Sequence, residues 1–271
     1  MKSPIAYYGS KLSIASEIVR LLPPHDHYVE PYAGSLAVLL AKTPSKMETV
    51  NDLDGRLMGW WRALRDRGDE LARVCALTPH SRAELAAAHE RADDELEDAR
   101  RVWVLLTQGR TGTMRNVGWR HHINPRGSSI GMPRYLKSYV DRIAPVAERL
   151  HGVSLECRPA LEVIRSYGRH PDVLLYVDPP YLGSTRARNY SHEMAGESDH
   201  RDLAAALHSC RAAIVLSGYA SPLYEDLYGG WRRYEISSRT HQGTGPAERI
   251  EVLWANRHLA VQDVLWDGEV A

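Results

Sequence analysis

Short apolar runs that alternate with longer helical patterns constrain the fold of this chain most strongly. Five of these runs are typical of buried strands: 27–30 (HYVE), 47–50 (METV), 153–156 (VSLE), 173–177 (VLLYV) and 213–217 (AIVLS). Between them are three segments whose apolar residues recur at helical spacing, 35–42, 160–168 and 200–210. Strand followed by helix, repeated, predicts an α/β fold with a mostly parallel sheet and helices on its faces.

The end of the sequence departs from this alternation. Residues 232–238 and 249–257 are two strand-like runs, and a glycine-rich loop, THQGTGPAE, joins them. Two such runs around a turn-forming loop are typical of an antiparallel hairpin. We therefore expect an antiparallel hairpin to close the sheet.

The alternation is also interrupted between about residues 55 and 150. Three segments there have helical patterns, 60–77, 81–106 and 135–150, and a glycine-rich polar stretch covers 107–133. This organisation predicts a helical insert at 56–149 in a core domain that is formed by 1–55 and 150–271.

Charge is segregated within the insert. The segment from Glu84 to Asp98 contains seven acidic residues and one basic residue. The segment from Arg100 to Arg142 contains nine Lys and Arg residues and one acidic residue. The net charge of the whole chain, +0, hides this contrast and by itself gives no sign of a nucleic-acid partner. A single charge run is typical of a solvated surface, so the basic segment alone identifies no partner.

Other features exclude several classes of protein. The cysteines, Cys75, Cys157 and Cys210, form no C-x-x-C pair, which argues against a zinc site or a disulfide framework. The histidine pairs 25/27 and 121/122 lack a third ligand at suitable spacing, so we expect no metal. We see no signal peptide and no run of about 18 apolar residues, and expect a cytoplasmic protein without a membrane span.

The most informative motif is Asp178-Pro179-Pro180-Tyr181, directly after the strand at 173–177. In an open parallel sheet, ligands bind beyond the carboxyl ends of the strands. Because the two prolines fix φ and remove two backbone donors, the motif holds a carboxylate, a carbonyl and an aromatic face on one stiff turn. Asp178 and the Pro179 carbonyl could accept both N–H bonds of an amino group on a planar ring, with Tyr181 stacked on that ring. The alternative is a rigid loop with an N-cap aspartate.

Five more segments, before and after D-P-P-Y, form an ordered set of motifs along the chain. Tyr7-Tyr8-Gly9-Ser10-Lys11 resembles a W-x-G-G-K segment, and Glu30-Pro31-Tyr32-Ala33-Gly34-Ser35 resembles the cofactor loop E-P-F-x-G-[SA]-G, with Tyr32 for the usual Phe. Asp52 follows the second strand, where an acidic side chain can accept hydrogen bonds from ribose hydroxyls. Residues 216–219 and 249–256 match later strands of the same family. With D-P-P-Y, these motifs resemble the Dam-like (D12 class) family of DNA adenine-N6 methyltransferases, from Tyr7 to Asn256.

The resemblance implies a fold, a cofactor and a reaction. The fold is a Rossmann-like S-adenosylmethionine-dependent methyltransferase sheet with a helical target-recognition insert. The enzyme would transfer a methyl group from S-adenosyl-L-methionine to adenine N6 in double-stranded DNA, as a monomer, after flipping the base out. The implied catalytic residues are Asp178, Pro179, Pro180 and Tyr181. The implied cofactor residues are Tyr7, Gly9, Lys11, Glu30, Pro31, Ala33, Gly34, Ser35, Asp52, Arg158 and Asp178.

In the basic segment and after the catalytic turn, the resemblance gives positively charged side chains a DNA-binding role. Arg and Lys supply phosphate contacts, and Arg or Asn can bind base edges in the major groove. The residues expected to contact DNA are Arg110, Arg115, Asn116, Arg120, Arg126, Arg134, Arg186 and Arg188.

Two positions depart from the family pattern. Leu36 replaces the glycine that often ends the cofactor loop, and Pro159 stands where an aspartate often binds the cofactor adenine. The expected substitutes are backbone groups around Arg158, or Glu156. The alternatives to DNA methylation are a methyltransferase that acts on an amine of RNA or protein, and a catalytically silent DNA-binding relative.

Overall fold

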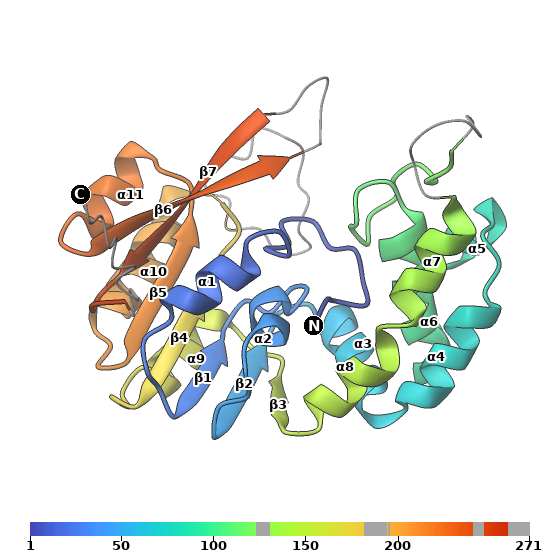
Figure 1. Cartoon of the computed structure of the whole chain (residues 1–271), viewed down its shortest axis with the longest axis horizontal. Helices are drawn as coiled ribbons and strands as arrows, with labels where there is room; N and C mark the ends of the chain where they lie inside the picture. The colour runs from blue at the N-terminus through green and yellow to red at the C-terminus, as the bar shows by residue number, and fades with distance from the viewer. Residues whose placement is uncertain (123–130, 182–193, 195, 241–246, 260–271) are drawn as a thin grey trace, which may run out of the picture.

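The computed structural model describes residues 1–122, 131–181, 194, 196–240 and 247–259 (Figure 1). Within this part of the chain, the core is one sheet of seven strands. From edge to edge these are β3 (Val153–Glu156), β2 (Met47–Asn51), β1 (His27–Glu30), β4 (Val173–Val177), β5 (Ala213–Gly218), β7 (Ala247–Ala255) and β6 (Arg232–Thr240). The first five strands in this order, β3, β2, β1, β4 and β5, are parallel to one another. Strand β7 is antiparallel to both β5 and β6. The predicted α/β class, parallel sheet and closing hairpin are confirmed.

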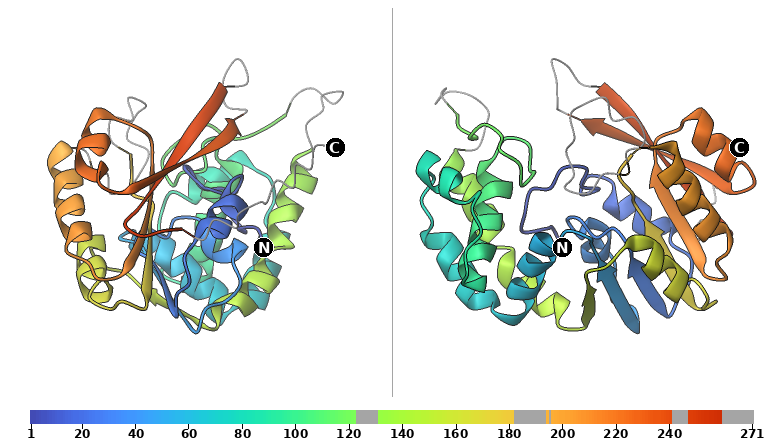
Figure 2. Two further views of the ribbon diagram at one scale, coloured as in Figure 1. Left: turned by 60° about the vertical axis from the view of Figure 1, so that its left-hand side comes forward. Right: turned by 180° about the vertical axis from the view of Figure 1, so that it is seen from behind.

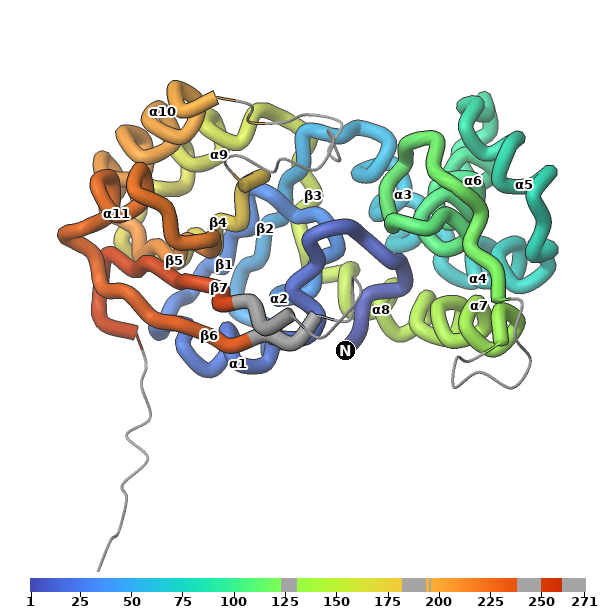
Figure 3. The backbone as a smooth tube through the Cα atoms, turned by 90° about the horizontal axis from the view of Figure 1, so that it is seen from above, coloured from blue at the N-terminus to red at the C-terminus, as the bar shows by residue number. Residues whose placement is uncertain are grey.

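Alternate residues of each strand face two different hydrophobic clusters. Tyr28 and Leu174 belong to the cluster that α1 (Ala15–Leu21) and α2 (Ala37–Ala41) cover. Val29 and Leu175 belong to the other, under α9 (Ala160–Tyr167), α10 (Glu197–His208) and α11 (Pro222–Tyr228). Figure 3 shows α1 and α2 on one side of the sheet and α9 and α10 on the other. Because helices cover both faces, the central strand β4 (VLLYV) is buried and apolar along its whole length.

Six helices of the described chain lie between β2 and β3, beside the β3 edge (Figures 1 and 2). They are α3 (Gly55–Asp66), α4 (Gly68–Leu77), α5 (Arg82–Ala87), α6 (Glu95–Gln108), α7 (Met132–Val140) and α8 (Ile143–Leu150). Trp60 and Trp103 of this group are fully buried in the same cluster as Val50 and Leu174 of the sheet. The helical segment and one face of the sheet therefore share a core.

Each of the three long helical patterns is divided into two helices. Between α3 and α4 the chain turns at Arg67, and α4 begins at Gly68, where a Cβ atom would lie 2.6 Å from Cβ of Ala147. Asp94 begins α6 anew by accepting a hydrogen bond from the amide of Glu97. Pro145 cannot donate to the carbonyl of Asp141, so α7 and α8 are separate.

Two short helices, α1 and α11, were not expected. Each has seven residues, too few for a clear apolar period, although Ser221 and Pro222 form a typical helix start for α11. Among the helices of the described residues, none has the length and apolar character that crossing a membrane requires.

Candidate active site

The connectivity of the sheet reverses between β1 and β4. From β1 the strand order runs outward through β2 to β3, and from β4 it runs the other way to β5. Because β1 and β4 are parallel neighbours, their carboxyl ends lie side by side at this point, where open α/β sheets bind ligands. A cavity of about 340 Å³ opens there, and Glu30 and Asp178 both line it.

The cavity collects the residues that the sequence motifs singled out. All of the predicted cofactor residues except Arg158 line it: Tyr7, Gly9, Lys11, Glu30, Pro31, Ala33, Gly34, Ser35, Asp52 and Asp178. Pro180 of the D-P-P-Y motif lines it as well. Asp54, Met194, Asp199 and Asp202 also contribute, although sequence analysis did not select them.

The loop between β1 and α2 takes left-handed backbone conformations at two residues. Gly34 has φ of 46° and Leu36 has φ of 56°. Hydrogen bonds fix the loop: the Gly34 amide donates to Oδ2 of Asp52 at 3.0 Å, and Nε1 of Trp61 donates to the Gly34 carbonyl at 3.1 Å. Asp52, expected to bind ribose hydroxyls, therefore also holds the loop in place.

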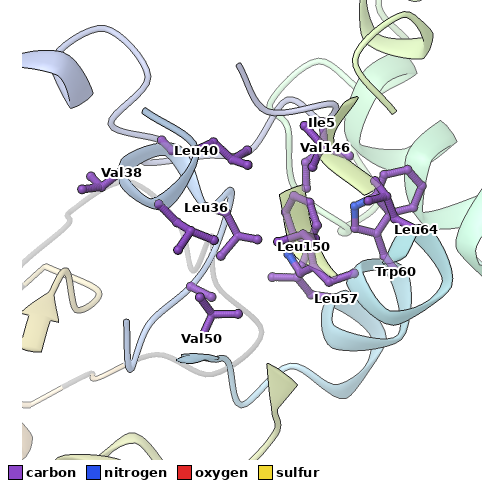
Figure 4. Packing of buried hydrophobic residues seen from close by; sticks show 14 of the residues in the cluster. Ile5, Leu36, Val38, Leu40, Val50, Leu57, Trp60, Leu64, Val146 and Leu150 are labelled. Carbon is purple, nitrogen blue, oxygen red and sulfur yellow. The ribbon is translucent and has the colours of Figure 1, made fainter. Parts of the chain in front are cut away.

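Leu36 keeps the backbone conformation that a glycine would adopt there. For a leucine this conformation costs about 1–2 kcal/mol. The Leu36 side chain is 0% exposed and belongs to the cluster that holds Leu40 and Val50 (Figure 4). It does not line the cavity. The departure at Leu36 consequently leaves the cavity open.

The residues around Pro159 meet the cavity differently from what was expected. Pro159, Ala160 and Leu161 line it, whereas the Arg158 guanidinium donates to Glu156. Asn51 holds the Arg158 backbone, donating from Nδ2 to its carbonyl and accepting from its amide, each at 3.0 Å. The first turn of α9, and not the Arg158 side chain, forms this wall.

Glu30 is a deeply buried carboxyl group at the end of β1, with 2% of its surface exposed. It accepts hydrogen bonds from the Tyr28 hydroxyl at 2.5 Å and from the Leu39 amide at 2.9 Å. Burial raises the pKa of Glu30 to about 8. The carboxyl group therefore holds a proton near neutral pH.

The turn at 178–181, the D-P-P-Y turn, is joined to the N-terminal motif by hydrogen bonds. Nζ of Lys11 lies 2.8 Å from Oδ1 of Asp178 and also donates to the Tyr181 hydroxyl. Burial raises the pKa of Asp178, Lys11 lowers it and Glu251 raises it further, with a net rise. Burial would lower the pKa of Lys11, but the charges of Asp178 and Glu251 outweigh this effect and raise it.

Two polar residues beside this turn, Glu251 and Ser217, belong to strand motifs found in the sequence but were given no role in the site. Glu251 of β7 accepts from the Tyr181 hydroxyl and from Oγ of Ser217 on β5, each at 2.6 Å. A glutamate inside the apolar run Ile-Glu-Val-Leu-Trp is a signal of a buried, partnered carboxylate. Tyr219 is the third addition: its ring centroid lies 4.6 Å from that of Tyr181.

The glycine-rich stretch of the insert begins with a small antiparallel turn. The Arg110 amide donates to the Gly118 carbonyl at 3.0 Å, and the Arg120 amide donates to the Gln108 carbonyl at 2.7 Å. We call residues 108–120 the insert hairpin. The Gly112 carbonyl accepts from the Tyr8 amide at 2.8 Å, so this hairpin contacts the segment that carries Lys11.

The residues expected to contact DNA differ in their surroundings. Arg110, Asn116 and Arg134 are exposed, and Arg115 is half-buried. The Arg120 guanidinium donates to the carbonyls of Gly109 and Arg110 and lies over the Tyr135 ring. Arg126, Arg186 and Arg188 lie outside the described residues.

Part of the positive charge counted in the sequence is paired within the insert. Arg100 binds Glu97 and Glu84, and Arg101 binds Glu97. Lys137 pairs with Asp141 in the same way. The basic surface is therefore smaller than the count of Lys and Arg predicts.

Comparisons with known proteins agree with the order of the motifs. A model of the D12 class N6 adenine-specific DNA methyltransferase family matches residues 7–242. The chain is 26% identical over 263 residues to the type II methyltransferase M1.LlaDCHI of Lactococcus lactis subsp. cremoris, with 90% of each protein covered. It is 24% identical over 258 residues to the retron Ec67 DNA adenine methylase of Escherichia coli, covering 92% of this chain and 88% of that protein.

A solved SAM dependent methyltransferase from Agrobacterium tumefaciens aligns with a TM-score of 0.38 and 12% identity, over 90% of this chain and 60% of that one. That likeness is too weak to argue from.

Proposed function

This chain belongs to the family of D12 class N6 adenine-specific DNA methyltransferases, and we propose that it transfers a methyl group from S-adenosylmethionine to N6 of an adenine flipped out of duplex DNA. The observation that carries the proposal is the position of Asp178. It follows the end of β4 and lines the cavity. Its Oδ1 accepts a hydrogen bond from Lys11 of the N-terminal motif.

The cavity suits the cofactor in size and in donor set. Ligand pockets are usually about 300–1,000 Å³, and this one is about 340 Å³. Asp52 lies where it could accept bonds from ribose hydroxyls, and the left-handed turn at Gly34 lets the backbone approach a ligand closely. When bound, S-adenosylmethionine supplies a methyl group that its sulfonium already activates.

The catalytic turn would prepare the acceptor amine. The lone pair of adenine N6 is delocalised into the ring, which makes the amine a poor nucleophile. Asp178 and the Pro179 carbonyl would accept hydrogen bonds from the two N–H groups of the amine. These bonds favour the pyramidal form of the amine and free its lone pair. Catalysis is then mainly alignment for in-line transfer. Tyr181 would stack on the flipped base and offset part of the few kcal/mol that flipping costs.

We further propose that residues 56–149 form the target-recognition insert, while 1–55 and 150–271 form the catalytic domain. The insert hairpin presents Arg110 and Asn116 to solvent, and its Gly112 is bonded to the N-terminal motif. DNA held on this hairpin would lie near the cavity. Exposed arginines would bind phosphates, and an asparagine can bind adenine edges.

The test compares the wild-type protein with Asp178→Ala on unmethylated plasmid DNA and S-adenosylmethionine, with N6-methyladenine mapped at base resolution. We expect methylation at one short sequence by the wild type and none by Asp178→Ala. Asp172→Ala is the matched control, because Asp172 is exposed at the opposite end of β4. It should methylate like the wild type.

Calorimetry with S-adenosylhomocysteine separates the alternatives. Asp178→Ala should bind it within a few-fold of the wild type. Near-wild-type methylation by Asp178→Ala would falsify the catalytic assignment. A wild-type protein that binds DNA but not the nucleoside would be a silent relative, and methylation of RNA or protein alone would identify a different acceptor amine.

A further inference from the structure

Glu251 is a second buried carboxylate beside the catalytic turn, with 4% of its surface exposed. It reaches this position because β7 pairs antiparallel with β5, where Ser217 lies opposite Leu253. Oε1 of Glu251 accepts from Oγ of Ser217 at 2.6 Å and from the Tyr181 hydroxyl at 2.6 Å. The hairpin thus brings a negative charge to the turn from the far end of the chain.

The Tyr181 hydroxyl has one proton and two carboxylates near it. Its oxygen is 2.6 Å from Glu251 but 3.1 Å from Oδ1 of Asp178, so the proton belongs to the Glu251 bond. The hydroxyl oxygen is then free to accept a hydrogen bond from the Lys11 ammonium, which lies against it. Glu251 therefore sets the direction of the O–H bond of Tyr181.

Lys11 has three N–H donors, and three acceptors surround it. They are the Gly9 carbonyl at 3.3 Å, Oδ1 of Asp178 at 2.8 Å and the Tyr181 hydroxyl oxygen. Nζ of Lys11 also lies 3.6 Å from Glu251, close enough for Coulomb attraction. With these acceptors, the ammonium has one preferred position, on Oδ1 of Asp178.

We propose that Glu251 is a positioning residue for methyl transfer: through the Tyr181 hydroxyl it fixes the Lys11 ammonium on Oδ1 of Asp178 and leaves Oδ2 to accept from the substrate amine. The inference rests on the proposed function. It adds that the antiparallel hairpin is part of the catalytic apparatus as well as the edge of the sheet.

The test uses Glu251→Gln, which keeps the size and an acceptor oxygen but removes the charge. Single-turnover methylation of duplex DNA is measured against pH. The plateau rate should fall roughly 10- to 100-fold, because small losses of alignment are costly. The acid limb should move to lower pH, since loss of a nearby like charge lowers the pKa of Asp178. The titratable groups facing Asp178 are Lys11, Tyr181, Glu251, Tyr176, Glu30 and Tyr224.

Two variants accompany it. Glu251→Asp keeps the charge, so its acid limb should stay at the wild-type pH while part of the plateau rate returns. Glu235→Gln makes the same chemical change on β6, at an exposed residue paired with Arg233, and should match the wild type in both respects. Binding of S-adenosylhomocysteine should change less than about threefold in all three.

A wild-type plateau in Glu251→Gln overturns the inference, and so does a lower plateau with an unmoved acid limb, which would mark a purely structural role. If Glu251→Gln does not fold, Tyr181→Phe tests the same link by removing only the hydroxyl. An unchanged plateau in that variant also overturns it. Failure of the proposed function is distinct, because the wild type itself would then methylate no DNA adenine.

Discussion

At the scale of single residues, Glu30 links stability to pH. Its folded-state pKa of about 8 lies above the ordinary carboxyl value, so folding favours the protonated form. The stability it gives is complete below the unfolded-state pKa and is lost as pH rises through about 8. Between these limits the free energy of unfolding should fall by up to about 1.4 kcal/mol for each pH unit.

Glu30→Gln should remove this dependence, because glutamine does not ionise but can still accept from the Leu39 amide. The measurement is urea unfolding of the ligand-free protein from about pH 5 to pH 8, for both proteins. The difference in their free energies of unfolding should grow with pH in favour of the variant. Parallel curves would mean that Glu30 is ionised in the folded protein.

The same residue scale marks where sequence analysis was sufficient and where it was not. The motif residues that line the cavity were predictable, because each follows a strand whose end was clear. Glu251 was not, because its partners Ser217 and Tyr181 come from other segments and only tertiary packing joins them. The left-handed backbone conformation of Leu36 was not predictable either, because a leucine in the sequence does not indicate it.

At the scale of elements, the insert hairpin assigns different tasks to two arginines. Arg110 is exposed and makes one long hydrogen bond within the hairpin, from Nε to the Trp119 carbonyl at 3.4 Å, whereas the Arg120 guanidinium is half-buried and donates to two backbone carbonyls. Arg110→Ala should therefore weaken DNA binding and reduce the slope of log K against log salt by about 1. Arg120→Ala should destabilise the hairpin instead.

The measurement is DNA affinity at several salt concentrations, with hydrogen exchange of the 108–120 amides. Arg110→Ala should leave amide protection as in the wild type, and Arg120→Ala should lower it. Arg65→Ala, at an arginine that pairs with Asp66 on α3, is the control for loss of one charge. An unchanged salt slope in Arg110→Ala would remove that residue from the interface.

Elements also differed in how well sequence predicted them. The five parallel strands were found to within one residue, and the two hairpin strands to within two. Helices were found but not their breaks. Gly68 at the start of α4 lies so close to Ala147 of α8 that a Cβ atom would be 2.6 Å away, and this contact between distant segments has no local signal in the sequence.

At the scale of the whole molecule, the insert and the sheet are joined by a buried ion cluster. Arg149, at the end of α8, contacts both oxygens of Glu48 on β2, and Nζ of Lys42 lies 2.6 Å from Glu48. The side chains of Arg149 and Glu48 are 8% and 3% exposed. With the shared hydrophobic core, this cluster predicts that insert and sheet unfold as one unit.

Arg149→Met should destabilise the protein by about 1–3 kcal/mol, because the buried Glu48 loses one of its two cations and keeps only Lys42. Hydrogen exchange measures the free energy of opening for amides of α6 in the insert and of β4 in the sheet. Both should fall equally. Arg62→Met is the control, since the pair of Arg62 with Glu95 is exposed and worth less than about 1 kcal/mol. Loss of protection in α6 alone would instead mean that the insert opens independently, so that DNA could reposition it without disturbing the catalytic sheet.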